Sequence, residues 1–362
     1  MNTKCQTVSF SILDILEIPL IKKKNILLVA GIKSYKNFLE NPSFSLLKKE
    51  LTWDHFYHFT PNPKKKEIEE GVKIFKKKNY NAIFTIGGGS AIDVGKLIKF
   101  FSKSKVPIYA LPTTCGTGSE ATTFATFYDH FIKKSIDDSS LLPDHIILDS
   151  SFLKTLPAYT KGNSLGDSLC HAVESYWNIN STSESLEYAE KAISSIINHS
   201  EDFMKNNKKD LFALKASHYA GKAINITRTT AAHALSYSLT SQFNIPHGQS
   251  VALFLPHLFK FNINLTEKNC ADKRGPLFVQ ERFGEISTLL KAKSLKEADK
   301  RFEIIFNIFG LKNSLKKLNI LKIPPSFDLQ VNSDRLKNNP RMILPKDVDY
   351  LFEKIKKDNS KE

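Results

Sequence analysis

One carboxylate and three imidazoles occur at spacings that suit a single divalent-metal site. Asp167 and His171 lie four residues apart, which places both side chains on one face of a helix. His233 and His247 follow within one later segment. This donor set suits Fe(II), Zn(II) or a similar first-row ion, and an open coordination position would let the ion act as a Lewis acid on a substrate oxygen. An isolated Asp-x-x-x-His pair is more often an ordinary helix-surface contact, so the interpretation depends on an upstream cofactor loop.

A glycine-rich loop lies upstream, between an expected strand and an expected helix. The apolar run 81–86 leads into GGGSAIDVGK at 87–96, and an apolar helical continuation follows. Glycines at this point let the backbone approach a phosphate, and the helix N-terminus supplies free N–H groups. The spacing fits neither a Walker A loop nor the G-x-G-x-x-G fingerprint. A glycine triplet at a strand end also forms ordinary tight turns.

A second loop repeats this arrangement one strand later. The apolar run 106–111 ends in PTTCGTGSE at 112–120, which offers hydroxyl groups and small residues to a ribose or a diphosphate. By itself the segment is also typical of a threonine-rich turn with a helix cap. Two such loops on successive strands favour a nucleotide-cofactor site.

Five stretches together resemble the iron-dependent (group III) alcohol dehydrogenase family and, more distantly, glycerol dehydrogenases and dehydroquinate synthase. They are GGGSAIDVGK, LPTTCGTGSE, LLPDHIILD, GDSLCHAVESYW and the run from His233 to IPHGQSVALFLPH, which span roughly residues 81–257. The resemblance implies an α/β N-terminal nucleotide-binding domain and an all-helical C-terminal domain, the dehydroquinate synthase-like architecture. It also implies an active site in the cleft between the domains.

The resemblance assigns roles residue by residue. The metal ligands would be Asp167, His171, His233 and His247, with Fe²⁺ as the expected ion and Zn²⁺, Mn²⁺ or Ni²⁺ as alternatives that fit the same donors. The organic cofactor would be NAD(P)H. The residues implied in cofactor binding are Gly88, Gly89, Ser90, Asp93, Thr113, Thr114, Thr117, Ser119 and Lys134.

Two positions depart from the family pattern. Many relatives carry a histidine four residues after the third ligand, where this chain has Tyr237, so the proton in a reduction would come from Tyr237, another histidine, a ribose hydroxyl or water. Relatives often end the first strand with an aspartate for the adenosine ribose, where this chain has Gly31. Because a missing carboxylate removes a charge that would repel a 2′-phosphate, we expect NADPH to be tolerated alongside NADH.

The segment before the third ligand suggests an anionic substrate. Arg228 and Lys222 lie within a few turns of His233, and the arginine fork matches phosphate or phosphonate oxygens. Both residues also fit the pattern of solvated helix residues in a lysine-rich chain. The sequence AINITRTTAAHALSYSLT resembles the phosphonoacetaldehyde reductase branch. The expected reaction is therefore reduction of phosphonoacetaldehyde to 2-hydroxyethylphosphonate, with Arg228, Lys222 and Tyr237 as catalytic-site residues. A general alcohol or aldehyde dehydrogenase and a polyol dehydrogenase are the alternatives.

Composition is typical of a globular enzyme. The chain has 362 residues, 41% hydrophobic and 25% charged, and its four cysteines form no C-x-x-C motif. No apolar stretch reaches membrane-spanning length and residues 1–16 lack a leader pattern, which predicts a cytoplasmic protein without a membrane partner. The net charge of +15 raises nucleic-acid binding as a remote alternative. Because the lysines form short scattered runs, such as 64–66 and 76–78, we expect no nucleic-acid partner. Members of the family that the chain resembles are often dimers or larger, so a homodimer is possible, although no sequence feature establishes an oligomer.

The element pattern predicts two domains, at residues 1–157 and 158–362. Short apolar strands at 25–30, 83–86, 108–111 and 146–148 alternate with helical segments, which favours a mostly parallel sheet covered by helices. The second half shows mainly helical patterns, at 164–177, 183–197, 210–224, 231–241, 280–290, 294–309 and 347–357, with an irregular stretch at 323–345.

Overall fold

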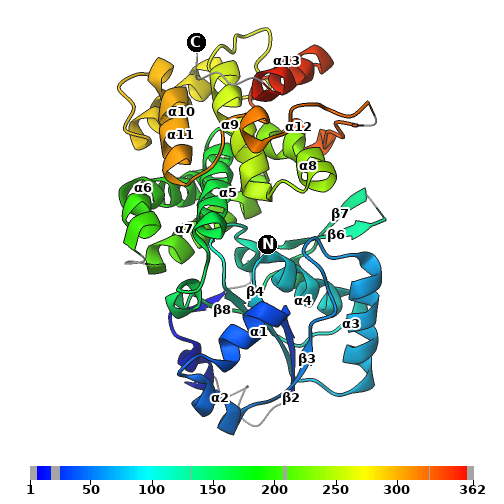
Figure 1. Ribbon diagram of the computed structural model, residues 1–362. Coiled ribbons are helices and arrows are strands. Elements are labelled where there is room, and N and C mark those ends of the chain that lie inside the picture. The colour runs from blue at the N-terminus through cyan, green and yellow to red at the C-terminus, as the bar shows by residue number, and fades with distance from the viewer. Residues whose placement is uncertain (1–5, 18–24, 131, 207–209, 326, 357–362) are drawn as a thin grey trace. The chain divides into compact units, whose positions relative to one another are not determined.

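The computed structural model describes residues 6–17, 25–130, 132–206, 210–325 and 327–356. The chain forms two compact units, Met1–Leu156 and Pro157–Glu362; the first runs from blue through cyan to its last, green elements, and the second from green to red (Figure 1). The expected boundary lay one residue later. The first unit is an α/β unit and the second is built from helices, so the predicted fold class is confirmed.

The first unit contains a sheet of six strands in the order β1-β8-β5-β4-β2-β3, and every neighbouring pair is parallel. Four strands match the predicted runs. The edge strands β1 and β3 were not predicted, because β1 has only three residues and β3 mixes polar and aromatic side chains. The strands are β1 (Thr7–Ser9), β2 (Asn25–Ala30), β3 (Thr52–Phe56), β4 (Ala82–Gly87), β5 (Ile108–Pro112) and β8 (His145–Ile147).

Successive residues of the sheet are covered by different helices, as the alternation of side chains along a strand requires. Leu28 packs in a cluster with Phe38 of α1 and Leu47 of α2. Its neighbour Leu27 packs in a second cluster with Ile98 of α4. Both faces are therefore buried, which explains the continuous apolar runs that made these strands predictable. The helices of this unit are α1 (Ile32–Leu39), α2 (Phe44–Glu50), α3 (Lys65–Lys77) and α4 (Gly89–Ser102).

The chain order of the sheet reverses at β2. The chain passes from β2 outward to β3, then returns to β4 on the opposite side of β2. The carboxyl ends of β2 and β4 therefore form a topological switch point, the position where open α/β sheets bind ligands. Gly31 follows β2 there and Gly88 follows β4, so the glycine-rich loop lies at the edge that the fold leaves open for a ligand.

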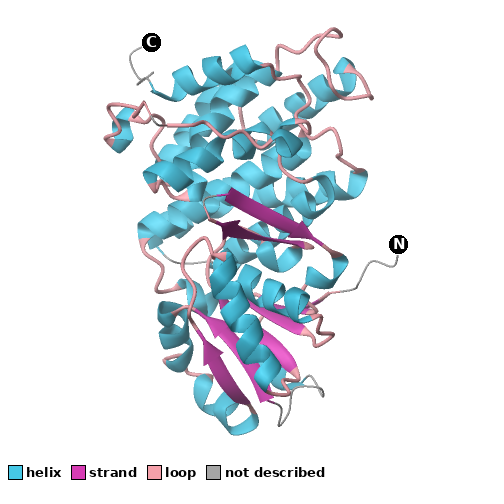
Figure 2. Ribbon diagram, turned by 90° about the vertical axis from the view of Figure 1, so that its right-hand side faces the viewer, coloured by secondary structure: helices cyan, strands magenta, loops and turns pink. Residues whose placement is uncertain are grey.

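A two-stranded antiparallel hairpin lies outside the main sheet. It consists of β6 (Phe124–Asp129) and β7 (Ile132–Asp137), and the sequence pattern did not predict it. Figure 2 shows the hairpin as two magenta arrows separate from the parallel sheet. Short 3-10 helices complete the unit: η1 (Ile12–Glu17), η2 (Ser119–Ala121), η3 (Ser139–Leu141) and η4 (Ser150–Leu153).

The second unit consists of helices joined by loops (Figure 2). The predicted helices are present with shifted ends, and Lys357 of the predicted closing helix lies outside the described residues. The helix that begins at His247 was not predicted, and a short helix interrupts the stretch expected to be irregular. The elements are α5 (Ala158–Tyr176), α6 (Ser183–Asn206), α7 (Asp210–Thr227), α8 (Ala231–Phe243), α9 (His247–Asn262), α10 (Pro276–Leu289), α11 (Leu295–Ile308), η5 (Lys316–Leu318), α12 (Ser333–Leu336) and α13 (Pro345–Lys356).

Within the described part of the chain, no helix is both long enough and apolar enough to cross a membrane. Residues 1–5, which belong to the segment used for the leader prediction, lie outside the described residues.

Candidate active site

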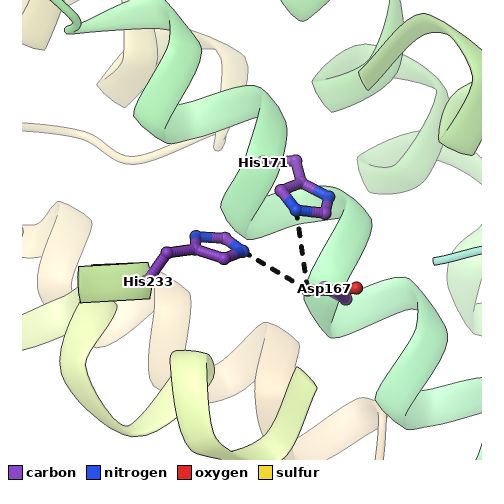
Figure 3. Close-up of side chains that lie close together, drawn as sticks. All are labelled: Asp167, His171 and His233. Carbon is purple, nitrogen blue, oxygen red and sulfur yellow. Dashed lines mark ion pairs between the residues drawn. The ribbon is translucent and has the colours of Figure 1, made fainter. Parts of the chain in front are cut away.

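Three helices of the second unit bring the four predicted metal ligands together. Asp167 and His171 lie one turn apart on α5, as their spacing predicted, and His233 lies in the first turn of α8. His247 is the first residue of α9. Figure 3 shows both Asp167 and His171 on one helix, with the ring of His233 directed toward the carboxylate from another.

The imidazole nitrogens converge on one carboxylate oxygen. The Nε2 atoms of His171, His233 and His247 lie 3.9, 3.5 and 3.8 Å from Asp167 Oδ1. Two ligand atoms that share an ion at roughly 2.1 Å are about 3.0 to 3.4 Å apart for bond angles between 90° and tetrahedral. Small inward movements of the side chains would therefore complete a coordination shell.

The buried polar atoms of this cluster fit a metal ion. Asp167 Oδ1 and His233 Nε2 are buried, and neither has a hydrogen-bond partner among the described residues. Such atoms are costly unless something satisfies them. Asp167, His171 and His233 form a group whose ligand atoms all lie within 4.8 Å of one another, and His247, which lies near Asp167 Oδ1, is not part of this group. The donor set of a carboxylate and imidazoles suits first-row divalent metals. Their assignment as ligands remains a prediction.

Opposite charges within the cluster shift its pKa values. Burial acts to raise the pKa of Asp167, but the nearby His171, His247 and His233 rings outweigh burial and hold it below its usual range. Burial acts to lower the pKa of His233, but the carboxylates of Glu174 and Asp167 raise it to about 10. A bound cation would take the place of the proton at His233, so metal binding at this cluster releases a proton.

Glu174 was not predicted as a functional residue, although it lies within a motif used for the family resemblance. It follows His171 by three residues on α5 and is fully buried. Its Oε2 pairs with Nδ1 of His233. The spacing of three residues, which puts Glu174 on the same helix face as His171, was the available signal.

Tyr237 and Gly248 lie beside His247. The Tyr237 ring stacks on the His247 ring, with centroids 5.9 Å apart. A Cβ at Gly248 would lie 2.0 Å from the carbonyl oxygen of Asn163 and 3.2 Å from Asp167 Cβ. Because only glycine permits this approach of α9 to α5, Gly248 determines where His247 begins its helix.

The predicted cofactor loops pack against each other in the first unit. Thr113 N donates to the carbonyl oxygen of Gly87, with 2.9 Å between N and O. A Cβ at Gly88 would lie 3.0 Å from Thr114 Oγ1, and one at Gly89 would lie 2.8 Å from Thr117. A side chain at Gly88 or Gly89 would therefore crowd the threonine side chains of the second loop, and Gly88 caps the N-terminus of α4. Ser90 follows in the first turn, partly exposed.

Asp93 and Ser119 are occupied by contacts within the protein. The Ser119 hydroxyl donates to Asp93 Oδ1, while Asp93 Oδ2 accepts hydrogen bonds from the backbone N–H and the hydroxyl of Thr126, each at 3.0 Å. Asp93 therefore ties α4 to the segment after the second loop. These contacts support the loops, and direct cofactor contacts from either residue remain predictions.

Lys96 is a second functional candidate that sequence reasoning missed. Its side chain is fully buried, and its Nζ donates to Thr122 O at 2.8 Å, to Phe124 O at 3.0 Å and to the carbonyl oxygen of Ser119. Burial lowers the pKa of Lys96 to about 8, against the opposing attraction of Asp93. Lys96 thereby fixes the segment that follows the threonine-rich loop. A lysine within an otherwise apolar helix was the signal.

Lys134 lies apart from these loops in the hairpin. It is an exposed residue of β7 opposite Phe127 of β6. Its proposed contact with the nucleotide remains a prediction.

The two cations proposed for an anionic substrate have partners within the helical unit. Arg228 follows α7 with a φ of 64°, and its Nη1 donates to the carbonyl oxygens of Ile224, at 3.3 Å, and Asn225. The guanidinium therefore caps the C-terminus of α7. The Lys222 ammonium lies 4.2 Å from the centroid of the Tyr188 ring on α6. A substrate role for either residue remains a prediction.

Family models match both units. The model described as iron-containing alcohol dehydrogenase matches residues 16–150, and that of the C-terminal part of the Fe-containing alcohol dehydrogenase family matches residues 163–355. The chain belongs to the iron-containing alcohol dehydrogenase family, as the sequence motifs predicted.

Particular relatives share parts of the sequence. The chain is 33% identical over 175 residues to the phosphonoacetaldehyde reductase of Streptomyces viridochromogenes, an alignment that covers 47% of this chain and 44% of that protein. It is 32% identical over 218 residues to 1-propanol dehydrogenase PduQ of Citrobacter freundii, covering 57% of this chain and 58% of that protein. The chain thus spans about half the length of these curated relatives.

The fold is similar to that of solved structures over nearly the whole chain. Sulfoacetaldehyde reductase from Bifidobacterium kashiwanohense, solved in complex with NAD⁺, matches with a TM-score of 0.82 and 22% identity. The match covers 97% of this chain and 96% of that chain. At this identity the similarity shows the fold.

Proposed function

We propose that the protein is a metal-dependent NAD(P)H oxidoreductase that reduces a small aldehyde to an alcohol. The observation that carries the proposal is the convergence of three imidazole nitrogens on Asp167 Oδ1, which itself has no hydrogen-bond partner among the described residues. Membership of the iron-containing alcohol dehydrogenase family supports Fe²⁺ as the ion.

The two units supply different parts of this reaction. Asp167, His171, His233 and His247 would hold the ion, and the free N–H groups at the start of α4 beside Gly88 would bind the diphosphate of the cofactor. When bound, the ion supplies Lewis acidity at the substrate oxygen and the nicotinamide supplies the hydride. The protein's own residues position the substrate and the cofactor and supply charges around them, whereas the electrons come from the cofactor.

Tyr237 is the proposed proton donor for the alkoxide oxygen. Its ring stacks on the ring of His247, one of the proposed ligands, which places Tyr237 beside the proposed metal site. A phenol hydroxyl can donate a hydrogen bond. Water and a ribose hydroxyl are the alternative donors.

The proposed tolerance of NADPH rests on Gly31. This residue follows β2 at the switch point of the sheet, where an acidic side chain would repel a 2′-phosphate. A Cβ at Gly31 would meet no atom within 4 Å, so a larger residue fits without strain. The Gly31→Asp variant should weaken NADPH binding about tenfold while NADH binding holds or improves, in fluorescence titrations of each cofactor. Equal affinities for NADPH before and after the change would contradict this proposal.

We propose phosphonoacetaldehyde as the substrate, reduced to 2-hydroxyethylphosphonate. The support is the resemblance of residues around the third ligand to the phosphonoacetaldehyde reductase branch and the partial alignment with the Streptomyces viridochromogenes enzyme. Arg228 is the proposed contact for the phosphonate. Its Nη1 caps α7, so a contact with the phosphonate would require the guanidinium to be shared between the helix cap and the substrate. Lys222 is retained as a proposed supporting charge.

The test compares phosphonoacetaldehyde and propanal with the Fe²⁺-loaded protein, following NADPH and NADH oxidation. We expect kcat/KM to favour phosphonoacetaldehyde strongly. Arg228→Ala should reduce this preference by about two orders of magnitude, because a bidentate charge-assisted contact is lost. Lys222→Ala tests the supporting charge, and Lys191→Ala removes an exposed lysine of α6 as the matched control.

Each outcome separates the possibilities. If Arg228→Ala lowers kcat/KM equally for both aldehydes, Arg228 acts only as a helix cap. If the unmodified protein turns over propanal better, phosphonoacetaldehyde is rejected as the substrate and the proposal of a general alcohol dehydrogenase remains. A polyol substrate would appear as oxidation of glycerol or its phosphate with NAD(P)⁺. The cytoplasmic location and the homodimer remain predictions.

A further inference from the structure

We infer that Glu174 is a positioning residue for the proposed metal site: its two carboxylate oxygens hold His233 and the start of α8 so that the His233 Nε2 lone pair is available to the ion. Glu174 is not itself among the proposed ligands. The inference rests on the proposed metal-dependent function and adds to it the residue that orients one of the ligands.

One oxygen of Glu174 determines the tautomer of His233. Its Oε2 pairs with His233 Nδ1, while His233 Nε2 lies 3.5 Å from Asp167 Oδ1. A carboxylate only accepts hydrogen bonds, so Nδ1 must carry the proton. In the neutral ring, Nε2 then keeps its lone pair and faces the proposed metal position.

The other oxygen of Glu174 caps α8. Its Oε1 accepts hydrogen bonds from the backbone N–H groups of Thr230, at 3.1 Å, and Ala232, at 2.9 Å, and from the Thr230 hydroxyl at 2.6 Å. The first N–H groups of a helix have no partner inside the helix, and a negative charge is favourable there. The Thr230 side chain makes no capping bond to α8, so a residue of α5 performs this task.

Both oxygens of Glu174 contact the same short segment at the start of α8. The contacts therefore position His233 in addition to stabilising the helix. The cap fixes where α8 begins, and His233 is only three residues after the cap position at Thr230. The Nδ1 contact then fixes the rotation of the ring. Glu174 is fully buried, and Thr230 Oγ1 also accepts a hydrogen bond from Trp177 Nε1 at 3.0 Å. The carboxylate therefore has little freedom to move.

Glu174→Gln is the decisive variant because it keeps the shape of the side chain while it removes the carboxylate charge and changes the pattern of donors and acceptors facing His233. Four donors of the Thr230–His233 segment face Oε1, so the amide oxygen must occupy that position. The amide NH₂ then faces His233 Nδ1 and makes it an acceptor. The proton moves to Nε2, where it blocks the metal. Thr230→Val is the matched control, because it removes one bond to Oε1 and leaves the Oε2 contact to His233 intact.

The experiment measures Fe²⁺ and Co²⁺ affinity by competition with a chelator, the visible spectrum of the Co²⁺ form, and urea unfolding of the metal-free proteins. We expect Glu174→Gln to weaken metal affinity about 10- to 100-fold and to alter the Co²⁺ spectrum. Thr230→Val should shift the unfolding midpoint of the metal-free protein while its metal affinity stays within about threefold of the unmodified protein.

The result that overturns the inference is a Glu174→Gln variant with unchanged metal affinity and spectrum. It is also overturned when both variants lose metal affinity in proportion to their loss of stability, because Glu174 would then act only through the fold. Failure of the unmodified protein to bind either ion would instead overturn the proposed function, and the inference with it.

Discussion

Lys96 in the first unit and Asp167 in the second are both buried charged side chains, and their surroundings differ in one respect. Three backbone carbonyl oxygens accept hydrogen bonds from the Lys96 ammonium. Asp167 Oδ1 faces three imidazoles at 3.5 to 3.9 Å and has no hydrogen-bond partner among the described residues. The Lys96 ammonium is hydrogen-bonded within the protein, whereas Asp167 Oδ1 and the facing His233 Nε2 have no hydrogen-bond partner among the described residues.

This difference separates buried groups that support the structure from buried groups that could bind a ligand. Buried polar groups are almost always paired, so a saturated cluster is consistent with a structural role, whereas several unsatisfied atoms that face one another call for an explanation such as a bound ion. By this criterion the Lys96 cluster supports the threonine-rich loop, and the Asp167 cluster is the proposed ion site. Substitutions at the two sites should therefore have separable effects on stability and chemistry.

The largest expected effect is at Asp167. Asp167→Asn keeps the size of the side chain but removes the negative charge that balances a divalent cation, so activity should fall by about three orders of magnitude or more. Metal content by atomic emission and the rate of NADPH oxidation test this directly. Cofactor binding, followed by fluorescence, should survive as the control. Normal activity in a variant without metal would break the comparison.

Lys96→Met should show the opposite pattern. It leaves the carbonyl oxygens of Ser119, Thr122 and Phe124 without their donor, and we expect a loss of about 3 kcal/mol in the free energy of unfolding, with weaker cofactor binding. Metal affinity should be unchanged. Urea unfolding and chelator competition provide the two readings. A loss of metal affinity without a loss of stability would contradict the division of roles.

The pH dependence of stability sharpens the comparison at Lys96. The pKa of Lys96 is lowered to about 8 by burial, whereas an unfolded lysine keeps its proton to about pH 10.4. Between these values the unfolded chain binds more protons, so raising the pH favours the folded state by up to about 1.4 kcal/mol per unit. Urea midpoints at pH 7.5, 8.5 and 9.5 measure this contribution as the difference from Lys96→Met. Parallel curves for the two proteins would refute the lowered pKa.

The smallest expected effect is at Tyr237. Tyr237→Phe keeps the ring that stacks on His247 and removes the proposed proton donor, so kcat for aldehyde reduction should fall about tenfold because water remains as an alternative donor. Metal content should not change. An unaltered kcat across the pH range would assign the proton to water or to a ribose hydroxyl.

The sequence predicted the parts of the molecule that local pattern determines. Asp167 and His171 share a helix face because of their spacing, and the strands at β2 and β4 are apolar because both sheet faces are buried. The helix that begins at His247 escaped prediction because a proline precedes it and Pro256 interrupts its pattern. The β6–β7 hairpin escaped because its strands are partly exposed and mix polar with apolar residues.

The supporting residues were harder to predict than the proposed ligands. Glu174 and Lys96 both lie inside motifs that the sequence made conspicuous, yet their roles depend on partners 56 and 23 residues away. Arg228 shows the same limit, because its helix-capping contacts require the left-handed backbone conformation at the end of α7. Such roles depend on tertiary contacts, which spacing alone does not define.

Gly248 has a consequence for ion selectivity. Divalent ions differ in preferred bond length by a few tenths of an ångström, from about 2.0 Å for zinc to about 2.3 Å or more for calcium. The separation of His247 from Asp167 is set by how closely α9 approaches α5, and a single hydrogen atom at Gly248 is all that the contact admits. If the proposed site holds an ion, the size of ion that it prefers would follow from a helix crossing, and Gly248, which is not among the proposed ligands, would set it.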